Sequence, residues 1–336
     1  MEGQQKFRHI YIEKRVMDHP RTREILAHFP ESRVILIDHY KAVFNRRGQS
    51  AALQHQSQNL ILAAAKDTNV YPGAPVCQDF GNAHFYYTSC TMNCLYDCEY
   101  CYLKGMYPSG NLVIFVELEK IFAEVEALLS QFPVYLCISY DTDLLAMEDI
   151  AHYCTAWSEF AAQHENLTIE IRTKCGRTDL WDHLPRCERV IFAYTISPEP
   201  VILAYEHGTA KLDNRLEAAA EGIAHGFPVR LCFDPMIYVP GWEEIYHDML
   251  VQTVKIVPLS RVRDFSVGSF RISESYLKNL RRQEPDSAVV QYPFTLDRGY
   301  YHYSQSLTER MERTLVEELG RMVPEAAVFR WEEPNE

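Results

Sequence analysis

The sequence lacks the features by which membrane, secreted and nucleic-acid-binding proteins are usually recognised. Its 336 residues contain no basic segment followed by an apolar one at the start, and no uninterrupted apolar stretch of about 18 residues, so we expect a cytoplasmic protein with no membrane association. Positive charge is scarce: the sequence has 33 Lys and Arg residues against 46 Asp and Glu residues, and its formal net charge is -13. This deficit argues against strong non-specific binding to nucleic acid, which depends on displacing counterions from phosphates.

The sequence also lacks a histidine metal-binding motif and the signs of a disulfide framework. The thirteen histidines form no H-x3-H or HExxH arrangement, so a second metal site is unsupported. The ten cysteines occur in a long chain without a secretion signal, which favours reduced thiols and metal ligation over disulfides. Four of these cysteines lie between Cys90 and Cys101. That segment is therefore the first candidate for a metal site.

Three of the four cysteines have the spacing C-x3-C-x2-C, in the run Cys94-Leu-Tyr-Asp-Cys98-Glu-Tyr-Cys101. Three thiolates leave one iron of a four-iron cluster without a protein ligand, and a small molecule can bind at that open position. With an aromatic residue, Tyr100, just before the last cysteine, the run resembles the signature of radical S-adenosylmethionine (SAM) enzymes. Cys94, Cys98 and Cys101 are the predicted metal ligands.

A zinc site is the alternative interpretation of the same segment. Cys90 precedes the three cysteines by four residues, and the four thiols together could close around zinc as a structural site. The x3 spacings are wider than the C-x2-C pairs common in zinc sites, and Cys90 falls where a strand is expected to end. A buried free thiol is the simpler interpretation of Cys90.

From about residue 84 onward, short apolar runs alternate with amphipathic stretches, a pattern typical of repeated βα units around a mostly parallel sheet. Helices are expected between the strands, for example at 118–129 and 212–220, where apolar residues recur at helical spacing. We predict six strands, at residues 85–88, 134–139, 167–172, 190–194, 229–233 and 263–267. Six units predict an α/β fold built on an incomplete parallel (β/α)6 barrel. The cysteine loop follows the first of these strands, so we expect it at the carboxyl-end face of the barrel, where parallel α/β folds collect their chemistry.

Three domains are predicted. Residues 1–80 carry strand candidates at 9–12 and 34–38 and a helix after Pro20, and they predict an N-terminal α/β cap. Residues 81–285 hold the barrel, and Tyr71-Pro-Gly-Ala-Pro75 is the strongest linker signal before it. Residues 286–336 are irregular and aromatic and end in a helix from 306 to about 322, so we expect a helical and irregular C-terminal extension that packs on the barrel.

The cysteine loop and several later segments together resemble the spore photoproduct lyase family of radical SAM enzymes. The loop from Cys94 to Leu103 is similar to that family's cluster loop, including Tyr100 and Tyr102. The later matches are, in order, Arg172-Thr-Lys174, Thr195-Ile-Ser197, Glu206-His-Gly-Thr209, Asp213-Asn-Arg215-Leu, and Asp234-Pro-Met-Ile-Tyr238 followed by Gly241-Trp-Glu243. The similarity spans most of residues 84–303.

The resemblance implies a 4Fe-4S cluster and SAM as cofactors. It also implies that Lys174 and Thr195 contact SAM, and the hydroxyl of Thr142 is a further candidate for that role. The implied reaction is reductive cleavage of SAM to a 5'-deoxyadenosyl radical, which abstracts hydrogen from a methylene-bridged thymine dimer in DNA. The protein's share is to position the reactants and to exclude water.

One segment departs from the family pattern. The family's hydrogen-donating cysteine lies in a Cys-Thr-Ser-Asp run, and the corresponding run here is Tyr140-Asp-Thr142-Asp143. A phenol O–H bond is close in strength to a thiol S–H bond, so we predict Tyr140 as the donor, with Tyr102 and Tyr100 as further catalytic residues. Cys137, three residues upstream in the same strand, is expected to point to the opposite face. Cys175, directly after Lys174, is the better-placed alternative thiol.

Three further groups of residues keep two interpretations each. Glu206 and Arg215 form a structural ion pair or contact a ligand. The basic run Lys278-Asn-Leu-Arg281-Arg282 contacts phosphates or is the solvated end of a helix. Tyr300, Tyr301 and Tyr303 stack on bases or pack within the protein.

The sequence thus predicts a cytoplasmic radical SAM lyase whose leading substrate is a thymine photoproduct in DNA, with an electron donor such as ferredoxin or flavodoxin as a second partner. The first alternative is a lyase-like relative with a different substrate, which the acidic charge and Tyr140 favour. An alternative of another class is a zinc-stabilised binding protein that uses the four clustered cysteines. That alternative predicts a colourless protein with zinc and no SAM cleavage.

Overall fold

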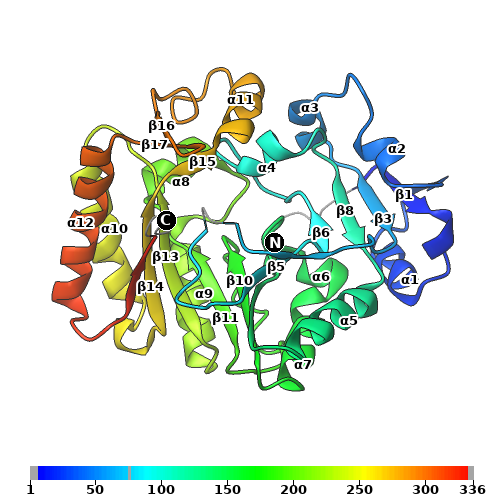
Figure 1. The fold of residues 1–336 in the computed structure, drawn as a ribbon, viewed down its shortest axis with the longest axis horizontal. Helices are drawn as coiled ribbons and strands as arrows, with labels where there is room; N and C mark the ends of the chain where they lie inside the picture. Colours follow the sequence, from blue (N-terminus) through cyan, green and yellow to red (C-terminus); the bar gives the residue numbers. More distant parts are fainter. Residues whose placement is uncertain (1–6, 75–76, 332–336) are drawn as a thin grey trace.

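The computed structural model describes residues 7–74 and 77–331, which form an α/β fold with two main sheets (Figure 1). Pro75, the last residue of the predicted linker, lies outside the described residues, whereas Tyr71 and Pro72 belong to a strand. The N-terminal sheet lies at the right of Figure 1 and the larger sheet at its centre and left.

The N-terminal sheet has the strand order β2-β1-β3-β8-β6. All pairs are parallel except β6 with β8. Its strands are β1 (His9–Glu13), β2 (Arg33–Ile37), β3 (Leu60–Ala63), β6 (Thr91–Met92) and β8 (Leu112–Phe115), and its helical segments are η1 (Lys14–Val16), α1 (Pro20–Ala27), α2 (Lys41–Phe44) and α3 (Ala51–His55). The predicted strands at 9–12 and 34–38 and the helix after Pro20 are confirmed. The sheet also takes in β8, so it extends past residue 80, and the three-domain division stays a prediction.

The larger sheet has the strand order β18-β14-β13-β11-β10-β9-β5-β4. Its strands are β4 (Val70–Pro72), β5 (Phe85–Thr88), β9 (Val134–Cys137), β10 (Leu167–Thr173), β11 (Val190–Thr195), β13 (Val229–Met236), β14 (Asp264–Ser269) and β18 (Val328–Arg330). From β5 to β14 neighbouring strands are parallel and follow chain order, as repeated βα units require. These six are the predicted strands, which are confirmed with ends shifted by a few residues.

Helices connect the strands of the larger sheet. These segments are helical because their apolar residues recur every three or four positions and so lie on one face, which packs on the core. In α5 the residues at this spacing, Leu118, Ile121, Val125 and Leu129, are all buried. The helical segments after β8 are α5 (Leu118–Leu129), η2 (Leu145–Met147), α6 (Glu148–Ala151), α7 (Tyr153–Ala162), α8 (Glu199–Tyr205), α9 (Leu212–Ala224), α10 (Trp242–Ile256) and η3 (Leu259–Arg261). The predicted helices at 118–129 and 212–220 are therefore present.

The C-terminal part adds a small antiparallel sheet and one helix above the larger sheet, and a second helix at its left side (Figure 1). These elements are β15 (Arg271–Ser273), α11 (Glu274–Gln283), β16 (Thr295–Asp297), β17 (Tyr300–His302) and α12 (Gln305–Met322). The Ser304 hydroxyl caps α12 by accepting a hydrogen bond from the Leu307 amide. The predicted terminal helix is confirmed as α12.

Buried charges pair with one another inside the larger sheet. Arg230 of β13 donates to Glu170 of β10 at 2.6 Å and forms an ion pair with Asp264 of β14. The Arg172 guanidinium lies 3.4 Å from the other Glu170 oxygen. Burial alone would raise the pKa of Glu170, but Arg172 and Arg230 hold it below its usual value. Glu170 is therefore a buried carboxylate stabilised by two arginines.

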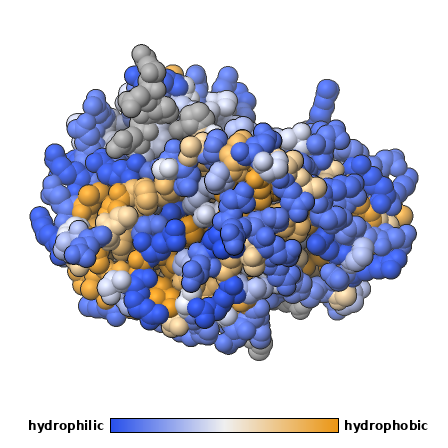
Figure 2. Space-filling model, turned by 60° about the horizontal axis from the view of Figure 1, so that its bottom comes forward, coloured by the Kyte–Doolittle hydropathy of each residue, from blue (hydrophilic) through white to orange (hydrophobic). Residues whose placement is uncertain are grey.

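Hydrophilic side chains cover much of the face that Figure 2 draws. Figure 2 shows apolar side chains gathered toward one side of a single face, the side on which Figure 1 places α10 and α12. Among the described residues, no helix combines the length and the apolar character that a bilayer crossing requires.

Candidate active site

A cavity of about 310 Å³ lies where the carboxyl ends of β9, β10, β11 and β13 meet. Parallel strands all end at the same edge of a sheet, so residues that follow different strands come together there. The segments after β9 and β10 contribute Tyr140 and Lys174 to the cavity wall, and β13 itself contributes Asp234. The predicted position of the cysteine loop at this edge is confirmed.

The three predicted cluster cysteines, Cys94, Cys98 and Cys101, all line this cavity. Cys98 belongs to β7 (Asp97–Cys98), which pairs with β12 (Glu206–His207). Burial raises the pKa of the Cys98 thiol to about 12, although the Lys174 ammonium, 4.0 Å from its sulfur, acts in the opposite direction. Burial also raises the pKa values of the Cys94 and Cys101 thiols. Such thiols need a cation to ionise them.

Cys90 is separate from these three cysteines. Its side chain is fully buried in the main core, and its thiol faces the Ile138 carbonyl oxygen at 3.6 Å. It is not among the residues that line the cavity. Within residues 7–74 and 77–331, no three His, Cys, Asp or Glu side chains converge on one metal position. A four-iron cluster does not require such convergence, because each cysteine binds a different iron.

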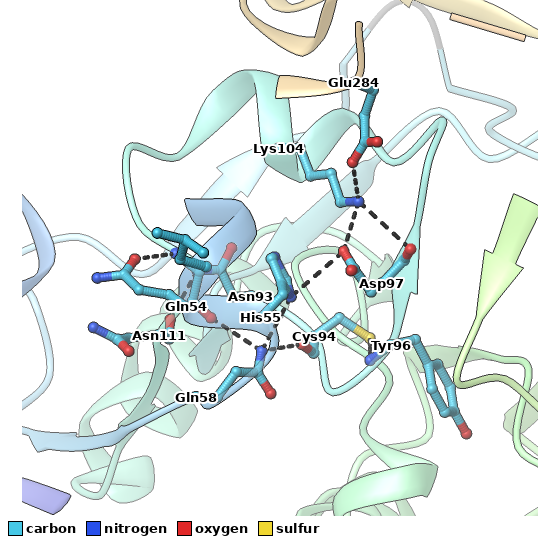
Figure 3. Close-up of polar contacts among 12 residues, drawn as sticks. Gln54, His55, Gln58, Asn93, Cys94, Tyr96, Asp97, Lys104, Asn111 and Glu284 are labelled. Atoms are coloured by element: carbon cyan, nitrogen blue, oxygen red, sulfur yellow. Dashed lines mark hydrogen bonds and ion pairs between the residues drawn. The ribbon is translucent and has the colours of Figure 1, made fainter. Parts of the chain in front are cut away.

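Polar contacts from neighbouring elements hold the cysteine loop in place (Figure 3). Lys104 of α4 (Tyr102–Met106) lies 2.5 Å from both the Asp97 carboxylate in the loop and the Glu284 carboxylate after α11. We call these three residues the Lys104 bridge. Gln58, after α3, donates to the Cys94 carbonyl at 2.9 Å. The bridge and Gln58 thus connect the loop to the C-terminal part and to the N-terminal sheet.

Close packing of α4 against α11 accompanies the Lys104 bridge. A Cβ atom at Gly105 would lie 2.3 Å from the Tyr276 carbonyl oxygen, so only glycine fits there. Asn279 of α11 donates to the Gly105 carbonyl at 3.0 Å. Tyr276 itself lines the cavity. The helix that carries one wall of the cavity is therefore attached directly to the end of the cysteine loop.

The three residues predicted to contact SAM, Thr142, Lys174 and Thr195, also line the cavity. The Lys174 ammonium lies 5.2 Å from the centre of the Tyr100 ring and 3.9 Å from Glu206. The Thr142 hydroxyl points toward the Met147 sulfur at 3.4 Å. The structure thus places one cation and two hydroxyl-bearing residues around the cavity that the cysteines face.

Glu206 and Arg215 form the structural ion pair that the sequence left open. Both side chains are fully buried, with 2.5 Å between Arg215 Nη2 and Glu206 Oε2, and neither lines the cavity. Glu206 also accepts hydrogen bonds from the Tyr100 and Ser197 hydroxyls. Burial alone would raise the pKa of Glu206, but Lys174 and Arg215 lower it to about 2. A permanent carboxylate therefore lies behind Lys174 and Tyr100.

The tyrosines predicted as catalytic are close together. Tyr140, Tyr102 and Tyr100 all line the cavity, and the Tyr102 hydroxyl donates to the Tyr140 carbonyl. The rings of Tyr102 and Tyr140 lie 5.5 Å apart. Tyr100 is held by Glu206. The hydroxyls of Tyr100 and Tyr102 are therefore engaged by Glu206 and by the Tyr140 backbone, whereas the Tyr140 hydroxyl contacts a thiol.

Sequence reasoning missed Cys77, whose thiol lies 3.7 Å from the Tyr140 hydroxyl and which also lines the cavity. It precedes β5 by several residues and belongs to no motif. No signal in the sequence pointed to it, because 63 residues separate it from Tyr140.

Cys137 and Cys175 do not lie where the sequence placed them relative to the cavity. Cys137 was expected to point away, but it lines the same cavity as Tyr140. The reason is that β9 ends at Cys137, so the two-residue alternation of a strand does not continue to Tyr140. Cys175, the thiol preferred from the sequence, is buried outside the residues that line the cavity. Cys77 and Cys137 are therefore the cavity thiols beside the cluster cysteines.

Two residues of the C-terminal groups, Arg281 and Tyr303, have packing roles. The Arg281 guanidinium donates to the carbonyl groups of Val290 and Tyr292, which supports the helix-end interpretation of that basic residue. Tyr303 is buried, and its hydroxyl accepts a hydrogen bond from the Tyr238 amide. Neither of these C-terminal residues lines the cavity.

Arg172 and Arg271 were not predicted as site residues, but both line the cavity beside Lys174. Arg271 lies 3.4 Å from Asp234. The match at Arg172-Thr-Lys174 could have pointed to Arg172, whereas nothing in the sequence marked Arg271. The cavity wall therefore carries three cationic side chains in a chain that is acidic overall.

The donor set fits the predicted cofactors. Three cysteines without other protein ligands face one cavity, and a lysine beside them compensates negative charge. The same cavity has polar groups and space beyond the thiols, as an open coordination position requires.

Comparison with known proteins gives consistent matches along the chain. A family model described as spore photoproduct lyase matches residues 6–330. Spore photoproduct lyase of Bacillus subtilis (strain 168) is 22% identical over 257 residues, which cover 74% of this chain and 73% of the relative. Spore photoproduct lyase of Clostridium acetobutylicum is 20% identical over 293 residues, with 84% of each chain covered.

Solved structures of spore photoproduct lyase have the same fold. A mutant with dinucleoside spore photoproduct gives a TM-score of 0.83 at 18% identity and covers 97% of this chain and 100% of its own. A mutant with bound AdoMet and dinucleoside spore photoproduct gives a TM-score of 0.81 at 19% identity, covering 96% and 98%. At these identities the structures establish the mixed α/β architecture.

Proposed function

Because the chain belongs to the spore photoproduct lyase family, we propose that it is a radical SAM lyase that repairs a thymine photoproduct in DNA. One observation carries this proposal. A single cavity is lined by the three cysteines of the C-x3-C-x2-C run, by Lys174 and by Tyr140, the residue at the family's donor position.

We further propose that β5, β9, β10, β11, β13 and β14 form an incomplete (β/α)6 barrel. The N-terminal sheet acts as its cap, and the elements after residue 285 act as a C-terminal extension. The parallel order of the six strands and the common edge at which the cavity lies support this assignment.

Cys94, Cys98 and Cys101 would hold a 4Fe-4S cluster, and Thr142, Lys174 and Thr195 would face SAM in the same cavity. When bound, these cofactors supply reductive cleavage of SAM and a radical that can abstract hydrogen from the substrate. The Lys174 ammonium, 4.0 Å from the Cys98 sulfur, would compensate the negative charge of that thiolate once the cluster is bound. Glu206, through Tyr100 and its contact with Lys174, keeps both side chains in place. An electron donor such as ferredoxin or flavodoxin is the proposed reducing partner.

Cys77 and Tyr140 take the place of the missing donor cysteine in this proposal. The thiol hydrogen moves to the carbon radical of the product, and the Tyr140 hydroxyl, 3.7 Å from the sulfur, restores that hydrogen. Both groups line the cavity, so either X–H bond can reach a molecule bound there. The thiol is the better first donor, because hydrogen transfer from sulfur to a carbon radical needs little reorganisation.

Arg172, Lys174 and Arg271 line the cavity together with three carboxylates, Asp143, Glu170 and Asp234. Arg172 lies 3.4 Å from Glu170, and Arg271 lies 3.4 Å from Asp234, so neighbouring carboxylates balance the cationic side chains. The proposal that the substrate is DNA therefore rests on the family assignment and not on the charge of the cavity.

The test is anaerobic reconstitution with iron and sulfide, reduction in the presence of SAM, and assay of 5'-deoxyadenosine with and without irradiated DNA. We expect iron incorporation, nucleoside release and loss of the photoproduct. A protein that retains zinc and cleaves no SAM would contradict the proposal.

A second candidate is a lyase-like enzyme with another substrate, which the Tyr140 substitution and the acidic charge favour. It predicts SAM cleavage without photoproduct repair. Comparing nucleoside release with repair in the same reaction separates the two candidates.

A further inference from the structure

Asp141 follows Tyr140 directly, yet its side chain is not part of the cavity wall. Asp141 is 1% exposed and does not line the cavity, although Tyr140 and Thr142 on either side of it both do. In the family's Cys-Thr-Ser-Asp run this position holds a threonine, so the donor position and the residue after it both differ in this chain. The contacts of the Asp141 carboxylate connect these two differences.

Two hydroxyl groups from different elements donate to one oxygen of Asp141. The Tyr107 hydroxyl, at the end of α4, lies 2.7 Å from Asp141 Oδ2, and the Ser89 hydroxyl, just after β5, donates to the same atom. At the start of α4, the Tyr102 hydroxyl donates to the Tyr140 carbonyl. The two ends of α4 therefore hold two consecutive residues of the segment that carries the donor.

The Asp141 carboxylate has a cationic neighbour. Burial raises the pKa of Asp141, whereas the hydrogen bonds from Ser89 and Tyr107 and the charge of Lys66 act in the opposite direction. The Lys66 ammonium, after β3, lies 5.2 Å from the centres of two aromatic rings. The second carboxylate oxygen, Asp141 Oδ1, is buried without a hydrogen-bond partner in the described part of the chain. Burying an incompletely paired carboxylate costs stability, which favours a role other than packing.

The position of the Tyr140 side chain depends on how its main chain is held. Its ring stacks on that of Tyr87 with 4.1 Å between the centres, and its hydroxyl lies 3.7 Å from the Cys77 sulfur. We call Cys77 and Tyr140 the donor pair. Because β9 ends at Cys137, residues 140 and 141 lie in a turn outside the sheet. Hydroxyl groups of neighbouring elements hold this turn in place of strand pairing.

We propose that Asp141 is a positioning residue that holds Tyr140 at hydrogen-transfer distance from Cys77. This inference rests on the proposed function, because it concerns the donor pair of that reaction. Asp141 touches neither substrate nor cofactor and acts through the main chain of Tyr140. A bulky phenol can therefore occupy a position that holds a small thiol in the family, because the adjacent carboxylate ties the turn to α4 and to the end of β5.

Three substitutions separate this role from a general effect on stability. Asp141→Ala removes the acceptor, and Tyr107→Phe removes one donor but keeps the buried ring. Glu148→Ala is the matched control, because Glu148 is also a buried carboxylate, at 4% exposure, and accepts hydrogen bonds from amides at the start of α7. Glu148 does not line the cavity. The control therefore removes a buried carboxylate from α6 and leaves the turn at Tyr140 unchanged.

The first experiment uses the full chain without cofactors, so that it does not depend on lyase activity. The rate of iodoacetamide alkylation at Cys77, followed by mass spectrometry of its peptide, measures whether Tyr140 still covers the thiol. We expect alkylation several times faster in Asp141→Ala and in Tyr107→Phe than in the wild type, and an unchanged rate in Glu148→Ala. Wild-type rates in both Asp141→Ala and Tyr107→Phe would overturn the proposal, as would an equal increase in Glu148→Ala. Circular dichroism and thermal unfolding verify that each variant is folded, and Tyr107→Phe alone decides the question if Asp141→Ala does not fold.

A second experiment uses the reconstituted enzyme and measures 5'-deoxyadenosine released per thymine photoproduct repaired. With tyrosine at position 140, we expect Asp141→Thr to raise this ratio about tenfold or more, because a misplacement of about 1 Å can cost about 100-fold in rate. In the Tyr140→Cys background no phenol needs to be positioned, so Asp141→Thr should leave the ratio unchanged. An equal increase in both backgrounds would refute the positioning role. Absence of SAM cleavage in the wild type would refute the proposed function, whereas the alkylation rates would still decide how Tyr140 is held.

Discussion

Replacing Lys104 by methionine is the sharpest test of how the cysteine loop is held. The Lys104 side chain is 5% exposed and lies 2.5 Å from both carboxylates of the Lys104 bridge. Burial alone would lower the pKa of Lys104, yet Asp97 and Glu284 raise it above its usual value. The charged form is therefore stabilised by its two partners.

The expected loss follows from the exposure of those partners. Breaking a fully buried pair by removing one charge costs about 3 to 5 kcal/mol, and an exposed pair contributes about 0 to 1 kcal/mol. The Asp97 side chain is 39% exposed and that of Glu284 is 21% exposed, so water stabilises part of the remaining charge. We expect Lys104→Met to lower the free energy of unfolding by about 2 to 3 kcal/mol.

Urea unfolding of the cofactor-free chain measures this loss. Lys120→Met is the matched control, because Lys120 pairs with Glu117 at 2.7 Å but its side chain is 59% exposed, so we expect a loss of at most about 1 kcal/mol. Adding Asp97→Asn and Glu284→Gln to Lys104→Met should recover much of the stability, because no unpaired charge then remains. Equal losses for Lys104→Met and Lys120→Met would refute the electrostatic explanation.

Three further predictions address the cysteines, the donor pair and acid stability. Cys98→Ala should abolish iron incorporation, whereas Cys90→Ala should retain it at lower stability; iron analysis and visible absorption after reconstitution distinguish these results, and retained iron in Cys98→Ala would contradict the ligand assignment. Cys77→Ala and Tyr140→Phe should each preserve SAM cleavage but impair photoproduct repair, measured as the ratio of nucleoside to repaired thymine; an unchanged ratio would remove the altered residue from the donor pair. Because the pKa of Glu170 is lowered in the folded protein, its contribution to stability is fully present above the usual carboxyl pKa. That contribution is lost as the pH falls from the usual pKa through the lowered pKa of the folded protein. The difference in unfolding free energy between wild type and Glu170→Gln should therefore shrink on acidification, and a constant difference would show that the Glu170 charge is not involved.

Residues that are close in sequence were predictable because local spacing determines their chemistry. The C-x3-C-x2-C run indicated three cluster ligands, and apolar periodicity indicated the six parallel strands and helices such as α5. The edge at which the cavity lies followed as well, since parallel strands end together. The resemblance to the family, carried by short motifs, pointed to Lys174, Thr195 and the departure at Tyr140.

Only the tertiary structure brings distant residues together. Cys77 contacts Tyr140 across 63 residues, and Lys104 meets Glu284 across 180, although neither pair belongs to a motif. The direction of Cys137 depended on where β9 ends, which the alternation of residues did not reveal. The sequence by itself thus determined the elements and the cluster chemistry, because these depend on neighbours along the chain. Which thiol faces Tyr140, and what holds the cysteine loop, depended on packing between elements that no local pattern encodes.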